Sequence, residues 1–122
     1  DVTGFGLAGH LWNICRASCV AARIDPDAVP LLPGAAALAE DGVRSTIRAA
    51  NRRAAPVAGL GETAREVLLH DPQTAGGLLA AVEADAADAL VARLLAAGSD
   101  AARIGSVEAG APGLRCGGAP GS

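Results

Sequence analysis

The sequence contains no lysine, so all ten of its basic residues are arginines. A chain without lysine cannot supply a Schiff-base lysine, a lysine general base or a P-loop lysine. Methionine is also absent, including from position 1. We therefore expect these 122 residues to be a piece of a longer protein, and any function found in them to be part of a larger one.

Aromatic residues and positive charge are scarce as well. Aromatics make up 2% of the chain and the formal net charge is -3, whereas nucleic-acid binders need a basic surface and stacking rings. We expect no nucleic-acid partner, and no membrane partner because no apolar run approaches the 18 residues of a span. The three cysteines, Cys15, Cys19 and Cys116, are sparse and odd in number, which favours a reducing compartment and predicts a cytoplasmic location.

Hydrophobic periodicity and turn residues predict one domain over residues 1–116, followed by a disordered tail over 117–122. Residues 43–55 show no clear pattern, and 55–61 resemble a loop. In the last predicted helix, Asp85 is the expected N-cap and Gly98 the expected end, with Leu90, Leu94 and Leu95 facing inward. The predicted helices cover 7–18, 34–41, 63–69 and 85–97, and the predicted strands cover 20–24, 78–82, 102–107 and 113–116.

The glycine-rich opening of the chain allows three interpretations. From Gly4 to Gly9 it spells G-x-G-x-x-G, and Asp25 follows at the distance of a ribose-binding acid, as in dinucleotide-binding proteins. No strand is visible before Gly4, which favours a tight turn that allows close packing. Alternatively, Asp1 binds Mg²⁺ through its carboxylate and the helix amides face phosphate oxygens. One carboxylate cannot hold Mg²⁺ alone, so further ligands would come from elsewhere.

A second motif, Asp-Pro-Gln-Thr-Ala-Gly-Gly, occupies residues 71–77. Asp-Pro opens a turn, and the glycine pair permits positive φ or close approach to a neighbour. The residues alone favour a structural loop that leads into the strand over 78–82. A binding loop that uses the Gln73 and Thr74 side chains is the alternative.

Together the two motifs resemble the selenophosphate synthetase (selenide, water dikinase) family. The similarity corresponds to the C-terminal domain of that family, which is shared with aminoimidazole ribonucleotide synthetase-like enzymes. It runs from Asp1 to about Cys116. The matching segments are Asp1-Val2-Thr3-Gly4-Phe5-Gly6-Leu7 with Gly9-His10-Leu11, Leu32-Pro33-Gly34, Asp71-Pro72-Gln73-Thr74 with Gly76-Gly77, Ile104-Gly105, and Pro112-Gly113-Leu114-Arg115.

The resemblance implies an α/β (α+β) fold: a three-layer α/β/α domain with a mixed sheet and partial ferredoxin-like topology. It implies an enzyme that makes selenophosphate, AMP and phosphate from selenide, ATP and water, with Mg²⁺ bound to ATP. Asp1 is the one residue to which a family role, that of Mg²⁺ ligand, carries over. The ATP-binding domain, with the family's catalytic lysine and its cysteine or selenocysteine, would lie N-terminal to this chain. We therefore expect the isolated chain to be inactive and the intact protein to be a homodimer.

Two alternatives to this function are a non-catalytic binding or assembly module and another ATP-using member of the same superfamily. The chain departs from the family pattern at Ala75, where serine is more usual, and at residues 44–46, where Gly-Gly-Thr is more usual; Asn51 matches a family asparagine loosely.

The remaining polar residues favour structural roles. We expect Cys15 and Cys19 to be buried small residues, Cys116 to be structural, and His10 to bond locally. His70 receives no role. An arginine-rich stretch is expected to be a solvated helix face, with phosphate binding as the alternative; it comprises Arg44, Arg48, Arg52 and Arg53.

Overall fold

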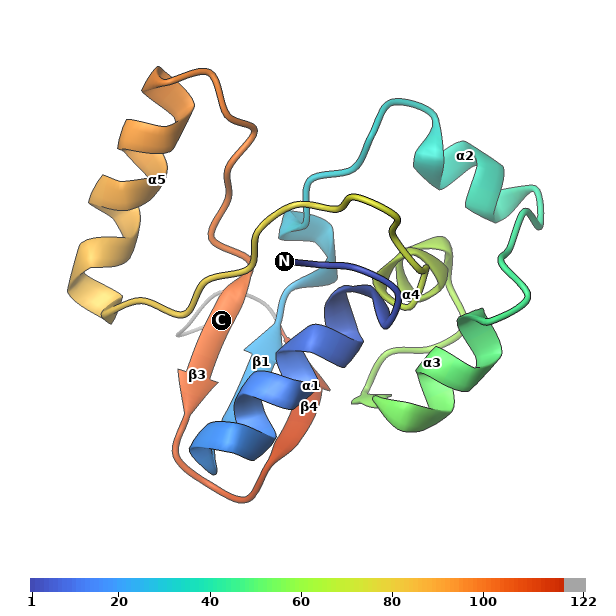
Figure 1. Ribbon diagram of the computed structural model, residues 1–122, viewed down its shortest axis with the longest axis horizontal. Helices are drawn as coiled ribbons and strands as arrows, with labels where there is room; N and C mark the ends of the chain where they lie inside the picture. Colours follow the sequence, from blue (N-terminus) through green and yellow to red (C-terminus); the bar gives the residue numbers. More distant parts are fainter. Residues whose placement is uncertain (118–122) are drawn as a thin grey trace.

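The computed structural model describes residues 1–117 (Figure 1). The tail predicted over 117–122 lies outside the described residues except for Gly117, whose amide donates to the carbonyl of Ile24 at 2.9 Å. The helices are α1 (Gly6–Ser18), α2 (Ala35–Glu40), α3 (Arg48–Ala54), α4 (Ala64–Leu69) and α5 (Ala87–Ala96), with 3₁₀ turns at Pro26–Ala28 and Ala84–Ala86. The strands are β1 (Ala21–Ile24), β2 (Val57–Ala58), β3 (Gly105–Glu108) and β4 (Gly113–Cys116).

The four strands form one mixed sheet in the order β2-β4-β1-β3. Strand β4 runs parallel to both β1 and β2, and β3 runs antiparallel to β1. The register places Leu114 beside Ala22 on one side and beside Val57 on the other. The predicted α+β class with a mixed sheet is thus confirmed.

The core lies between α1 and one face of the sheet, across which α1 runs in Figure 1. Side chains alternate across a strand, so Ala22 and Ile24 of β1 are buried while Arg23 turns to the opposite face. Helix α1 meets this sheet face with small residues, which allow a close approach between the two elements. The core residues are Ala8, Leu11, Cys15, Ala22, Ile24, Ala55, Val57, Leu69 and Leu114.

Residues 78–82 are not a strand, contrary to the sequence prediction. Leu78 is 84% exposed, and in the described sheet β3 pairs with β1 alone. A short apolar run has strand character only where a neighbouring strand satisfies its backbone groups. The run here leads instead along one wall of an apolar cleft, although Leu79 still packs against the core.

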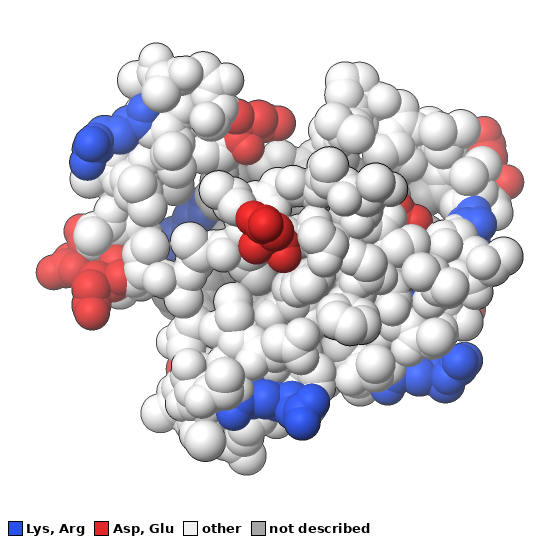
Figure 2. Space-filling model, viewed as in Figure 1, with Lys and Arg blue, Asp and Glu red and all other residues white. Residues whose placement is uncertain are grey.

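Helix α5 stands apart from the body of the protein across this cleft of ≈ 1250 Å³, which opens as a hollow between α5 and α2 in Figure 2. Leu90 and Leu94 both line the cleft, whereas Leu95 is 51% exposed and is not a cleft residue, so the inward face predicted for all three is wrong for Leu95. Asp85 lies within the preceding 3₁₀ turn and does not cap the helix.

Other local signals agree with the structure. Thr63 caps α4 by accepting the Glu66 amide at 3.2 Å, and Gly98 adopts a φ of +92° after α5. The stretch 43–55 contains α3, while the loop expected over 55–61 contains the short strand β2. The predicted strand over 102–107 is shifted to Gly105–Glu108.

No helix among residues 1–117 is long and apolar enough to cross a bilayer.

The cysteines differ in environment. Cys15 is fully buried as predicted, whereas Cys19 is exposed at the left-handed end of α1, so the prediction of burial is wrong for Cys19. Cys116 is half-buried and packs against the core, as expected of a structural residue.

We predict that iodoacetamide will modify Cys19 readily and Cys15 slowly in the folded protein. Burial raises the pKa of the Cys15 thiol, and the thiolate is the reactive form. Peptide mass spectrometry over a time course measures both rates, and denaturation should make them similar. Equal rates in the folded protein would contradict the packing of α1 described above.

Candidate functional site

The two glycine-rich motifs, far apart in the sequence, lie side by side in the structure. The amide of Val2 donates to the carbonyl of Gly77 at 2.9 Å, and the Gly76 amide donates to the Val2 carbonyl at 3.1 Å. The Gln73 amide donates to the Thr3 carbonyl at 3.0 Å. In Figure 1 the segment after α4 accordingly passes beside the N-terminal residues. We call residues 1–6 and 71–77 the paired motifs.

Two glycines make this close pairing possible. A Cβ atom at Gly76 would overlap the Val2 carbonyl oxygen. Gly6 has a φ of +75°, and a Cβ there would lie 2.9 Å from the Leu69 carbonyl oxygen. By contrast, a Cβ at Gly77 would meet nothing within 4 Å. Gly6 and Gly76 therefore serve a close approach between backbones, whereas Gly77 does not.

The dinucleotide-binding interpretation of the opening is wrong. That site requires a strand before the first glycine, but residues 1–3 belong to no strand and lie outside the sheet. They enter α1 through a tight turn in which the Gly6 amide donates to the Thr3 carbonyl at 3.0 Å. The turn and the paired-motif contacts account for the glycine spacing.

His10 holds the same turn from within α1. Its Nε2 accepts the Thr3 amide at 3.0 Å and lies 3.1 Å from the Thr3 hydroxyl, while its ring contacts that of Phe5. The expected local role of this histidine is confirmed. Its Nε2 is occupied as an acceptor, so His10 fixes the backbone next to Asp1.

Asp1 lies exposed at the outer end of the paired motifs, in a shallow depression lined in part by His10, Asn13 and Leu79. Within residues 1–117, no three histidine, cysteine, aspartate or glutamate side chains gather closely enough to hold a metal ion. Asp1 therefore offers a single hard oxygen ligand. Such a carboxylate fits Mg²⁺, which proteins commonly bind through one or two carboxylates together with substrate phosphates and water.

Asp71 opens the second motif beside the cleft. Burial raises the pKa of its carboxyl group, and the hydrogen bond from Gln73 Nε2 to Asp71 Oδ2, 3.0 Å long, acts in the opposite direction. The Gln73 side chain is thus directed back onto its own loop. This contact favours a structural role for the Gln73 side chain over a role in ligand binding.

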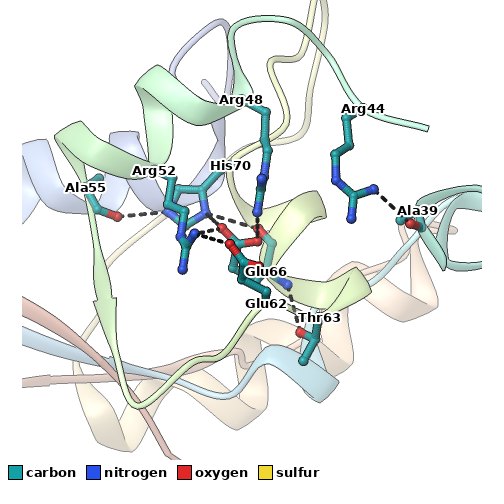
Figure 3. Close-up of polar contacts among 9 residues, drawn as sticks. All are labelled: Ala39, Arg44, Arg48, Arg52, Ala55, Glu62, Thr63, Glu66 and His70. Atoms are coloured by element: carbon teal, nitrogen blue, oxygen red, sulfur yellow. Dashed lines mark hydrogen bonds and ion pairs between the residues drawn. The ribbon is translucent and has the colours of Figure 1, made fainter. Parts of the chain in front are cut away.

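A buried ionic cluster lies beneath the paired motifs (Figure 3). Glu66 of α4 is 1% exposed, and its carboxylate contacts Arg48 and Arg52 of α3. Its Oε1 lies 3.2 Å from Arg52 Nε and 3.1 Å from His70 Nδ1. The carboxylate at the centre of Figure 3 therefore lies between the two arginines of α3 and His70 of the turn that follows α4.

His70 is bonded through both ring nitrogens. Nε2 lies 2.9 Å from the Ala55 carbonyl oxygen, and Nδ1 lies 3.0 Å from the Glu66 carbonyl oxygen. His70 thus connects the residue that leads into β2 with α4, and its Nδ1 also lies close to the Glu66 carboxylate.

Comparison with known proteins gives the chain a family. The family model described as AIR synthase related protein, C-terminal domain, matches residues 1–116. The chain belongs to this family.

Three relatives of this AIR synthase related chain are each named selenide, water dikinase. The protein of Myxococcus xanthus is 44% identical over 119 residues, covering 93% of this chain and 34% of the relative. That of Pseudomonas straminea is 40% identical (92% and 33%), and that of Shewanella sp. (strain MR-4) is 42% identical (88% and 31%). The resemblance found in the motifs is confirmed, and the chain spans about a third of the length of these relatives.

Within this AIR synthase related domain, the arginine-rich stretch has a structural role that the sequence did not reveal. Arg48 and Arg52 bind Glu66, and Arg44 donates to the Ala39 carbonyl at 3.1 Å. The prediction of a solvated face is therefore wrong for Arg48, whose side chain is 13% exposed. Neither Glu66 nor His70 was assigned a role.

A charge pattern could have revealed the cluster. Glu66 of α4 and His70 at the C-cap of α4 are four residues apart, and Arg48 and Arg52 are four apart on α3, so the two members of each pair point to the same side. Glu66 also interrupts an otherwise apolar helix face that includes Val67 and Leu69.

We predict that Gly76→Ala separates the paired motifs and that Gly77→Ala leaves them intact. The added methyl group would overlap the Val2 carbonyl in the first variant and meet open space in the second. Hydrogen exchange at the Val2 amide, which bonds Gly77, should accelerate at least about tenfold in Gly76→Ala, as expected if about 1.4 kcal/mol of local stability is lost. Equal exchange in the two variants would argue against the pairing.

We predict that Glu66→Gln destabilises the protein by about 3 kcal/mol or more, since it leaves buried cations without their carboxylate. The matched control is Glu62→Gln: Glu62 also contacts Arg52, at 2.7 Å, but its side chain is 72% exposed. Its loss should cost less than about 1 kcal/mol. Urea denaturation measures both values, and similar losses in the two variants would refute a special role for the buried carboxylate.

Proposed function

We propose that this chain is the C-terminal domain of a selenide, water dikinase, which makes selenophosphate, AMP and phosphate from selenide, ATP and water. The observation that carries the proposal is the pairing of the two motifs. The segments that resemble the family, 1–6 and 71–77, meet in one backbone-bonded unit. The relatives named selenide, water dikinase, at 40–44% identity, support the same assignment.

In this proposal the chain provides Asp1 as one ligand of a Mg²⁺ ion bound to ATP. The bound ion would offset negative charge on the phosphates as a phosphoryl group is transferred. The other ligands, the nucleotide pocket and a lysine would come from the N-terminal part of the protein, because this chain contains no lysine. The isolated chain is therefore proposed to be inactive.

The task of this chain's own residues is to hold Asp1 in place. Val2 is bonded on both its amide and its carbonyl to the second motif. Thr3 is held by His10 through its amide and by Gln73 and Gly6 through its carbonyl. Four anchored backbone groups immediately after Asp1 restrict where its carboxylate can lie. A fixed ligand needs less ordering when the metal and ATP bind.

The proposal extends to the setting of the intact protein. The family resemblance predicts a homodimer in the cytoplasm. The three cysteines are free thiols, as in a reducing compartment.

We predict that Asp1→Asn, made in the intact protein, lowers selenide-dependent conversion of ATP to AMP by at least on the order of 100-fold, since loss of an outer-shell partner of a metal ligand already costs about 10- to 100-fold. An amide is a weaker Mg²⁺ ligand than a carboxylate. Because Asp1 is exposed, the melting temperature should not change. Phosphorus NMR of the products measures the rate at saturating selenide.

Asp41→Asn is the matched control, because it removes one exposed carboxylate from the end of α2. It should retain the parent activity. Full activity of Asp1→Asn would remove Asp1 from the metal site, and an intact parent protein with no selenide-dependent ATP turnover would refute the proposed function itself.

A further inference from the structure

Asn51 connects the buried cluster to the paired motifs. The buried polar residues of the described chain are Asn51, Glu66 and His70, at 8%, 1% and 1% exposure. Glu66 and His70 contact each other directly, and Asn51 bonds the backbone of His70. Asn51 lies on α3 between the two arginines that bind Glu66. The three residues therefore form one polar unit inside the domain.

The Asn51 amide group bridges the later part of the first motif and the residue that precedes the second. Its Nδ2 donates to the Gly4 carbonyl at 2.9 Å and to the His70 carbonyl at 3.0 Å. Gly4 lies within the first motif, and His70 immediately precedes Asp71 of the second. Both hydrogens of one amide group are used, one on each segment.

The bridge adds to the backbone bonds between the motifs. At one end Val2 is bonded to Gly76 and Gly77; further along, Thr3 is bonded to Gln73. The Asn51 side chain then joins Gly4 to His70. The two motifs thus run antiparallel to each other. The contact between Gly4 and His70 is the one that depends on a side chain, that of Asn51.

We propose that Asn51 is a positioning residue for the Mg²⁺–ATP site: it sets the relative placement of the two motifs, and so the position of Asp1, without touching metal or nucleotide. This inference rests on the proposed function and deepens it. The ligand whose binding it governs is the divalent cation held by Asp1.

The chemistry of the bridge requires an amide at this position. An aspartate of the same shape would place oxygen atoms against two carbonyl oxygens and could donate to neither. A glutamine keeps both N–H donors but moves them outward by one methylene group. Because Arg48 and Arg52 bind α3 to Glu66, the helix cannot shift freely to recover the bonds. Each substitution should therefore displace the motifs rather than move α3.

The experiment compares Asn51→Asp and Asn51→Gln with the parent in the intact protein, at a temperature at which each is folded by circular dichroism. We expect the Mg²⁺ concentration for half-maximal selenide-dependent ATP turnover to rise on the order of tenfold in Asn51→Asp, as for losses of outer-shell partners. Asn51→Gln should show a smaller rise. The control is Arg53→Gln on the exposed side of the same helix, which should match the parent.

Two readouts are independent of activity. Mn²⁺ titration followed by electron paramagnetic resonance should show weaker binding in the Asn51 variants, by a similar factor. Hydrogen exchange should accelerate in residues 2–6 and 71–77 and remain unchanged in β1 and β4. A residue important for stability alone would lower the melting temperature but leave the cation dependence of the folded protein unchanged.

The outcomes separate the two proposals. Parent-like Mg²⁺ dependence and Mn²⁺ affinity in folded Asn51 variants would overturn the inference and leave the proposed function standing. Failure of both variants to fold would also overturn it, because Asn51 would then be a stability residue. If the parent lacks selenide-dependent turnover, the proposed function fails, while the Mn²⁺ and exchange measurements still decide the role of Asn51.

Discussion

The buried carboxylate of Glu66 is the constraint on which the rest of the arrangement depends. A charge removed from water is costly unless its partners remain in place, and the partners here come from separate segments: Arg48 and Arg52 from α3, and His70 from the turn after α4. His70 in turn bonds Ala55, which leads into β2. Movement of any of these segments away from α4 would leave a buried charge uncompensated. The cluster therefore specifies how α3 packs against α4.

The same cluster determines where the glycine-rich motifs meet. His70 is both the last member of the ionic cluster and the residue before the second motif, and Asn51 ties its carbonyl to Gly4. The helix pair α3 and α4 therefore fixes the position of the paired motifs, which lie at the surface and begin at Asp1. This separation is physically reasonable, since a glycine-rich edge has few side chains with which to hold itself rigid. Its order has to come from neighbours with side chains.

The parts of the fold that depend on local interactions could be predicted from the sequence. Helix α1 follows from its apolar spacing, the start of α4 from the Thr63 cap, and the end of α5 from Gly98. The conformation of residues 78–82 could not be predicted in this way. A strand forms only where a neighbouring strand can pair with its backbone, and the composition of the segment does not show whether such a neighbour is present. The site divides similarly. The motifs were recognisable as a resemblance, but their pairing depends on tertiary contacts, and Glu66 and His70 were overlooked because surface-type residues are rarely buried unless paired.

The absence of lysine can now be related to this arrangement. Phosphoryl transfer requires positive charge close to the phosphates, and two arginines of α3, Arg48 and Arg52, are bound to Glu66. If such an arginine bound a substrate phosphate instead, the buried carboxylate of Glu66 would lose its positively charged partner, which is energetically costly. The positive charge of Arg48 and Arg52 is therefore used to hold α3 against α4, and the contribution of this domain to catalysis in the proposed function is the single carboxylate of Asp1. A cation bound by Asp1 would then supply positive charge that these two arginines do not.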